Sequence, residues 1–170
     1  TGWRGGPPVA RGEGRRQAGG GPRERWATAR PRIRRTFVGW LPAVAGVDDP
    51  TELAAPRLAE ILSRFFSELG WGTVEVTPLG DAAFAIDSLN WPEAQADAGV
   101  QYPSCFFTSG LLADFVSRIA DAGLAVMEVE CRSRADARCR WLVGAPETLT
   151  ALYQHMAQRA DYLTVIGAGA

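Results

Sequence analysis

The feature that most constrains this chain is the placement of its three cysteines. Cys105, Cys131 and Cys139 are its only cysteines, and Glu128 lies three positions before the middle one. An odd number of cysteines cannot all pair in disulfides within one chain, whereas three thiolates and one carboxylate are donors that tetrahedral zinc prefers. The pattern therefore predicts a metal site, and the fold must bring these separated positions together.

The number of donors favours a structural zinc, because a catalytic zinc keeps one position open for water. The alternative is that the cysteines are reduced and pack as small apolar side chains. The fourth donor is open between Glu128 and Glu130. On a regular strand both carboxylates share the face opposite Cys131, so Glu128 joins the cysteines only if the strand bends or bulges. Otherwise we expect Glu128 to pair across the strands with Arg138 or Arg140.

Charge is distributed unevenly along the chain. The net charge is −1, but residues 1–36 hold ten of the 18 arginines and only two of the 19 acidic residues, together with many glycines and prolines. Such a segment cannot offset its ordering entropy by burial, so we expect 1–36 to be a disordered arm. No binding module accompanies the arm, and we expect no specific nucleic-acid binding. We assign residues 37–160 to one domain and 161–170 to a C-terminal tail.

Hydrophobic periodicity predicts a helix, two strands, and then the same order again. The expected elements are a helix over 56–70, strands over 73–77 and 82–87, a helix over 105–123, strands over 124–131 and 138–143, and a helix from about Pro146. The fold class is α+β, with a single antiparallel sheet built from two helix-strand-strand units, helices packed on it, and a C-terminal helix.

The connection from Ser88 to Ser104 is longer than ordinary loops, so we expect it to be mobile or functional, with a lid as one role. Aromatic side chains on and around this connection are candidates for a ligand pocket, and each is also a candidate for ordinary core packing. The candidate ligand-binding residues are Phe84, Trp91, Tyr102, Phe106 and Phe107. The single histidine, His155, is expected at a surface or interface.

The segments Ala125-Val-Met-Glu-Val-Glu-Cys131 and Cys139-Arg-Trp-Leu-Val143, with the spacing of the cysteines, resemble the 4-vinyl reductase domain family over roughly residues 37–160. The resemblance implies a homodimeric α+β domain with a mostly apolar pocket for an aromatic or larger hydrophobic molecule. It also implies that zinc is held by Cys105, Glu128, Cys131 and Cys139, which selects Glu128 over Glu130.

Members of that family include sensory domains of phenol- and xylene-responsive transcription activators and a protein encoded with bacteriochlorophyll synthesis genes. The phenol-sensing members place a histidine and a tryptophan in the pocket, whereas the only histidine here lies in the last predicted helix. Phenol itself is therefore not the expected ligand.

We expect a zinc-stabilised binding module for a hydrophobic or aromatic small molecule, acting as a sensor or carrier. The alternative is an enzyme or accessory factor in tetrapyrrole or bacteriochlorophyll biosynthesis, acting in vinyl reduction. No dinucleotide-binding glycine motif, phosphate loop or serine nucleophile motif accompanies the cysteines, so we assign no catalytic residue. No stretch approaches the length of a membrane span and no signal-peptide pattern is present, so we expect a cytoplasmic protein.

Overall fold

The computed structural model describes residues 22–158 and 161–167 of the chain. Its centre is an antiparallel sheet of four strands in the order β1-β2-β4-β3. The strands are β1 (Glu75–Leu79), β2 (Ala83–Ser88), β3 (Ala125–Glu130) and β4 (Cys139–Gly144). The predicted α+β class with a single antiparallel sheet is confirmed.

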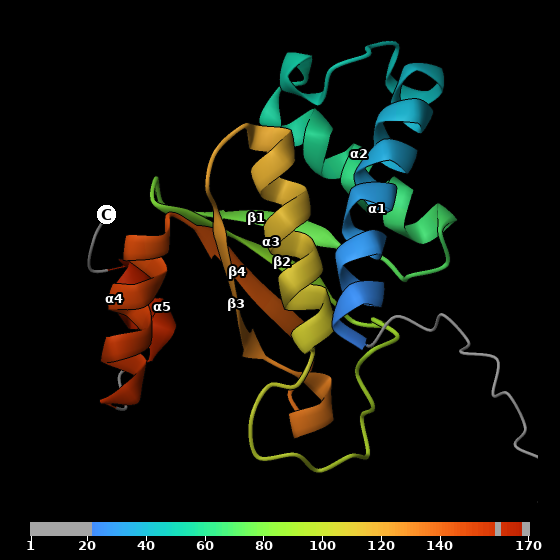
Figure 1. Ribbon diagram of the computed structural model, residues 1–170. Helices are drawn as coiled ribbons and strands as arrows, with labels where there is room; N and C mark the ends of the chain where they lie inside the picture. The colour runs from blue at the N-terminus through green and yellow to red at the C-terminus, as the bar shows by residue number, and fades with distance from the viewer. Residues whose placement is uncertain (1–21, 159–160, 168–170) are drawn as a thin grey trace, which may run out of the picture.

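The helices lie on both faces of this sheet (Figure 1). They are α1 (Pro22–Ala45), α2 (Ala55–Glu68), α3 (Phe106–Ala120), α4 (Pro146–Ala157) and α5 (Tyr162–Gly167), with short 3₁₀ helices η1 (Pro50–Glu52) and η2 (Arg132–Arg134). The predicted order of helix, strand, strand occurs twice, as α2-β1-β2 and α3-β3-β4. Proline stands in the first turn of α2 and of α4, where its missing N–H is not needed.

The larger core lies between the sheet and helices α1, α2 and α3, and aromatic rings dominate it. Phe65 and Phe66 of α2, which belong to the predicted apolar stripe, are each 1% exposed. Phe115 of α3 lies 6.2 Å from Phe65 and 5.7 Å from Phe66 between ring centroids. Burial of such rings is the main stabilising term that holds these helices on the sheet.

The smaller core lies on the other face, under α4 and α5. Leu149 and Leu152 of α4 pack there with Leu142 of β4 and Val129 of β3. Tyr162, the first residue of α5, is 8% exposed and belongs to the same cluster. The sequence assigns this residue to a C-terminal tail, and the structure instead gives it a packed position.

The start of the first helix also differs from expectation. Helix α1 begins at Pro22, whereas we expected an arm without structure through residue 36; residues 1–21 of that arm lie outside the described residues. Phe37 and Leu41 of α1 are fully buried. Phe37 packs edge-on against Phe65 and Phe115, with ring centroids 5.0 and 5.3 Å apart, and this burial fixes the second half of the helix.

The connection between β2 and α3, residues 89–105, is held by hydrogen bonds at several points. Trp91 is 2% exposed, and its indole N–H donates to Thr108 Oγ1 at 2.5 Å. The Glu93 carboxylate accepts the Thr108 hydroxyl and two backbone N–H groups in the first turn of α3, at 2.6 to 2.9 Å. Further along, the Val100 N–H donates to the Ser133 carbonyl at 3.1 Å.

No helix among the described residues is long and apolar enough to cross a membrane.

Candidate metal centre

Three elements bring the predicted donors together. Cys105 is the residue before α3, Glu128 lies on β3, Cys131 follows β3, and Cys139 begins β4. The three cysteines are fully buried and reduced. The cluster therefore joins the N-terminus of α3 to two neighbouring strands, and we call these four residues the four-donor cluster.

The spacing of the donor atoms suits a single tetrahedral ion. The Sγ atom of Cys105 lies 3.7 Å from that of Cys131 and 4.0 Å from that of Cys139, and all four donor atoms lie within 4.8 Å of one another. Two sulfurs bound to one zinc at about 2.3 Å are separated by about 3.8 Å in tetrahedral geometry. The sulfurs are thus spaced as ligands of one ion and are too far apart for a disulfide bond.

A β-bulge in β3 brings Glu128 to the cysteines. Glu128 pairs with Trp141 and Glu130 pairs with Arg140, so Val129 is an extra residue opposite no partner. The bulge places Glu128 on the face of the larger core and Glu130 on the face of α5. We expected Glu128 to join the cysteines only if the strand bends or bulges. The bulge in β3 meets that condition.

One oxygen of Glu128 remains for a metal. Its Oε2 atom accepts the backbone N–H of Cys105 at 2.8 Å, while its Oε1 atom is buried and has no hydrogen-bond partner in the described part of the chain. A buried carboxylate oxygen without a partner costs free energy, and a divalent cation between it and the three sulfurs removes that cost. The donor set of the four-donor cluster therefore fits zinc.

The thiols of Cys105 and Cys139 influence each other. The hydrogen bond to Cys139 and then burial raise the pKa of Cys105, whereas the same hydrogen bond lowers the pKa of Cys139. The backbone N–H of Arg132 also lowers the pKa of Cys139. Cys139 is accordingly the sulfur of this pair that more readily becomes a thiolate.

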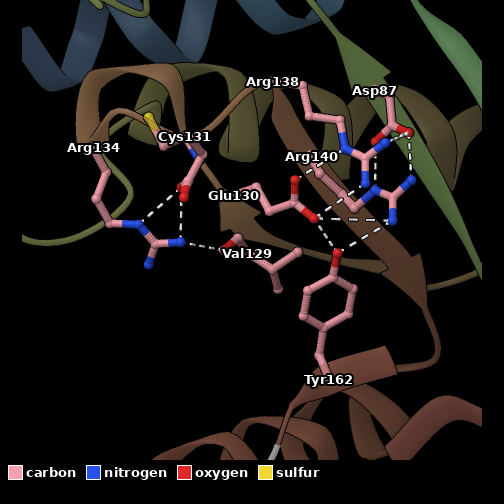
Figure 2. Close-up of polar contacts among 9 residues, drawn as sticks. Asp87, Val129, Glu130, Cys131, Arg134, Arg138, Arg140 and Tyr162 are labelled. Atoms are coloured by element: carbon pink, nitrogen blue, oxygen red, sulfur yellow. Dashed lines mark hydrogen bonds and ion pairs between the residues drawn. The ribbon is translucent and has the colours of Figure 1, made fainter. Parts of the chain in front are cut away.

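Three of the arginines near the last two cysteines form ion pairs with carboxylates (Figure 2). The closest contacts are Arg134–Asp136 at 2.7 Å, Arg138–Glu130 at 3.0 Å and Arg140–Asp87 at 2.6 Å. The alternative pairing of Glu128 with Arg138 or Arg140 is not found among these contacts, because the bulge turns Glu130 toward those arginines in its place.

The structure does not gather the five predicted ligand-binding residues in one pocket. Trp91 lies in the larger core, with ring centroids 5.5 Å from Trp141 and 5.9 Å from Trp71, and Phe107 contacts Trp71 at 6.0 Å. Tyr102 and Phe106 are 68% and 77% exposed.

Phe84 is the candidate that lines an apolar recess. The recess has a volume of about 240 Å³ and lies between η1, α2, α3 and the sheet. Its apolar lining includes Leu53, Leu58, Leu62, Phe84, Val116, Ile119 and Leu124, and Thr51 also lines it.

Sequence reasoning missed one residue that positions the cluster. Asp136, in the turn between Cys131 and Cys139, accepts the backbone N–H of Cys131 at 2.7 Å and binds Arg134. An aspartate in a short turn between two predicted metal ligands is the signal for such a role, since aspartate side chains commonly accept nearby backbone N–H groups.

Comparison with known proteins gives matches over part of the chain. An uncharacterized protein of Methanocaldococcus jannaschii is 27% identical over 88 residues, which are 52% of this chain and 47% of that protein. The chain thus spans about half the length of this curated relative.

Two solved structures are similar at low identity. A vinyl-4-reductase family protein from the same archaeon is 17% identical, with a TM-score of 0.44 over 75% of this chain and 83% of that one. The phenol-responsive sensory domain of the transcription activator PoxR, solved with phenol, is 16% identical, with a TM-score of 0.48 over 74% of this chain and 66% of that one.

The family comparison matches the part of the chain that contains the four-donor cluster. Residues 90–145 match the V4R domain, a shorter range than the 37–160 expected from the sequence. The predicted resemblance to the 4-vinyl reductase family is therefore confirmed over residues 90–145, which contain Cys105, Glu128, Cys131 and Cys139.

Proposed function

We propose that this chain is a zinc-stabilised module that binds a small hydrophobic molecule and serves as a sensor or carrier. Two observations carry the proposal. A carboxylate oxygen of Glu128 and the three cysteine sulfurs all lie within 4.8 Å of one another, and the buried Glu128 Oε1 atom has no hydrogen-bond partner among the described residues. Cys105, Glu128, Cys131 and Cys139 would hold the metal.

The metal would be structural. Four protein donors complete a tetrahedral coordination sphere and leave no position for a reacting water. When bound, zinc would neutralise thiolates and a carboxylate that are costly to bury, and metal binding of this kind is coupled to folding. The cluster would thereby tie the start of α3 to β3 and β4.

The apolar recess beside Phe84 supports the small-molecule part of the proposal. An apolar cavity of about 150 Å³ accepts benzene, so the 240 Å³ recess has room for a single aromatic ring with a short substituent. Thr51 is the polar residue among the described residues that line the recess, and none of those residues is charged, so the proposed guest is uncharged.

Zinc binding is tested on the full chain by native mass spectrometry and by thermal unfolding with and without a chelator. We expect one zinc per chain and a large loss of stability on chelation. Cys139→Ser should lose the zinc, whereas Ser104→Ala, whose hydroxyl lies 3.9 Å from the Cys131 sulfur, should keep it. Equal zinc content in both variants would contradict the assignment. The same spectra report the subunit number, for which the family resemblance implies a dimer.

Ligand binding is tested with toluene as a neutral probe. We expect toluene to raise the unfolding temperature of the zinc-loaded protein. Leu58→Trp, which places an indole in the recess, should abolish the effect, whereas Leu163→Trp on the exposed part of α5 should retain it. If toluene has the same effect on both variants, or none on the wild type, the recess is not the ligand site.

A further inference from the structure

We infer that metal binding at the four-donor cluster is coupled to the docking of α5 on the opposite face of the sheet, through the bulge in β3. The inference rests on the proposed zinc site. It assigns a connecting role to residues that bind neither metal nor small molecule, and it links the cluster to the last described helix of the chain.

The bulge gives one short stretch of β3 a contact on each face of the sheet. Glu128 reaches the cysteines, while Val129 and Glu130 both face the smaller core and α5. Because these residues are consecutive, a change in the backbone conformation at Glu128 also changes the backbone that positions Glu130.

The side chain of Arg134 holds the bulge in this shape (Figure 2). Arg134 Nη2 donates to the carbonyl of Val129 at 3.1 Å, and its guanidinium also binds the Asp136 carboxylate. Asp136 in turn accepts the backbone N–H of Cys131. The ion pair of Arg134 and Asp136 therefore contacts both Val129, the extra residue of the bulge, and the backbone of Cys131, a proposed zinc ligand. The position of Cys131 and the shape of the bulge consequently depend on each other.

On the other face, Glu130 belongs to a network that holds α5. The Tyr162 hydroxyl donates to Glu130, and Arg140 Nη1 donates to the same hydroxyl oxygen at 3.2 Å. Arg140 is fixed by two hydrogen bonds to Asp87 at 2.7 and 2.6 Å (Figure 2). Since Tyr162 is 8% exposed, its hydroxyl depends on these protein partners more than on water.

Zinc binding at the four-donor cluster and docking of α5 should therefore affect each other. If zinc stabilises the bulge, it favours the docked position of α5, and by reciprocity a docked α5 raises the affinity for zinc by the same factor. Coupling free energies between such sites usually correspond to factors of about 5 to 150.

The test combines hydrogen exchange with zinc affinity on the full chain. Exchange of the amides of α5 should slow by about fivefold or more when zinc ions are added to the chelator-treated protein. Tyr162→Phe should weaken zinc binding by a similar factor, measured by competition with a chelating dye. Tyr153→Phe is the matched control, because Tyr153 lies on α4 and is 64% exposed.

The outcomes separate this inference from the proposed function. If zinc binds in a one-to-one ratio but leaves the exchange of α5 unchanged, and both tyrosine variants bind it as tightly as the wild type, the coupling is refuted while the metal site stands. If zinc does not bind at all, both are refuted. Slower exchange in the wild type with weaker binding in Tyr162→Phe alone supports the coupling.

Discussion

The buried ion pair between Asp87 and Arg140 gives a stability prediction whose size follows from the structure. The two side chains lie on the paired strands β2 and β4, are 10% and 8% exposed, and form two hydrogen bonds at 2.6 and 2.7 Å. The Asp87 carboxylate is the main cause of the raised pKa of Arg140. Asp87→Asn removes the charge and leaves the guanidinium buried with a weaker partner.

Breaking a buried pair by removing one charge costs about 3–5 kcal/mol. Arg140 retains the Tyr162 hydroxyl at 3.2 Å and the Glu130 carboxylate at 4.0 Å, so we expect the lower end, about 3 kcal/mol. For a domain of this size that corresponds to a fall of about 6–12 °C in the unfolding temperature.

The assay is urea unfolding of the zinc-loaded protein, followed by circular dichroism. Asp97→Asn is the matched control, because Asp97 is exposed in the connection before α3. If Asp87→Asn and Asp97→Asn unfold at the same urea concentration, the pair does not stabilise the sheet and the reasoning is wrong.

Three further predictions follow from individual contacts. Glu93→Ala should lower the unfolding free energy by about 1–2 kcal/mol in urea, because its carboxylate caps α3. Gly72→Ala should destabilise more than Gly80→Ala in the same assay: both have positive φ, but a Cβ at Gly72 would lie 2.6 Å from Asn90 Oδ1, whereas at Gly80 it meets open space. Burial and Glu130 raise the pKa of Tyr162, so its stabilisation is present below about pH 10, the ordinary tyrosine value, and is lost as pH rises through the folded pKa. Tyr162→Phe should therefore flatten the alkaline limb of the stability profile.

Each of these has a contradicting result. Unchanged stability of Glu93→Ala would show that the cap is dispensable, and equal losses at the two glycines would show that Asn90 yields to the added methyl group. An alkaline limb as steep in Tyr162→Phe as in the wild type would assign the pH dependence to other groups.

Local pattern was sufficient to predict most of the architecture. Helices α2 and α3 and all four strands lie close to where the sequence pattern predicts them, and the two helices bury the predicted apolar residues. The four-donor cluster followed from residue chemistry and spacing, and the bulge in β3 is the one backbone feature that the prediction required.

The features that the sequence pattern did not predict depend on tertiary contacts. Trp91 stands in a polar segment, so its neighbours gave no sign that it would pack against Trp141 in the core. Tyr162 follows a weakly patterned stretch, and its burial depends on Arg140 and Glu130, which are distant in sequence. Helix α1 was not predicted, because the burial of its second half depends on contacts of Phe37 with rings of α2 and α3, which are distant in sequence.

X-ray absorption at the zinc edge on the freshly purified full chain tests the central claim most directly. We expect a four-coordinate zinc with three sulfur neighbours at about 2.3 Å and one oxygen at about 2.0–2.2 Å, the oxygen being lost or replaced in Glu128→Ala. A spectrum with only nitrogen and oxygen neighbours, or one identical in Glu128→Ala and the wild type, would contradict the assignment of Cys105, Glu128, Cys131 and Cys139 as the metal site.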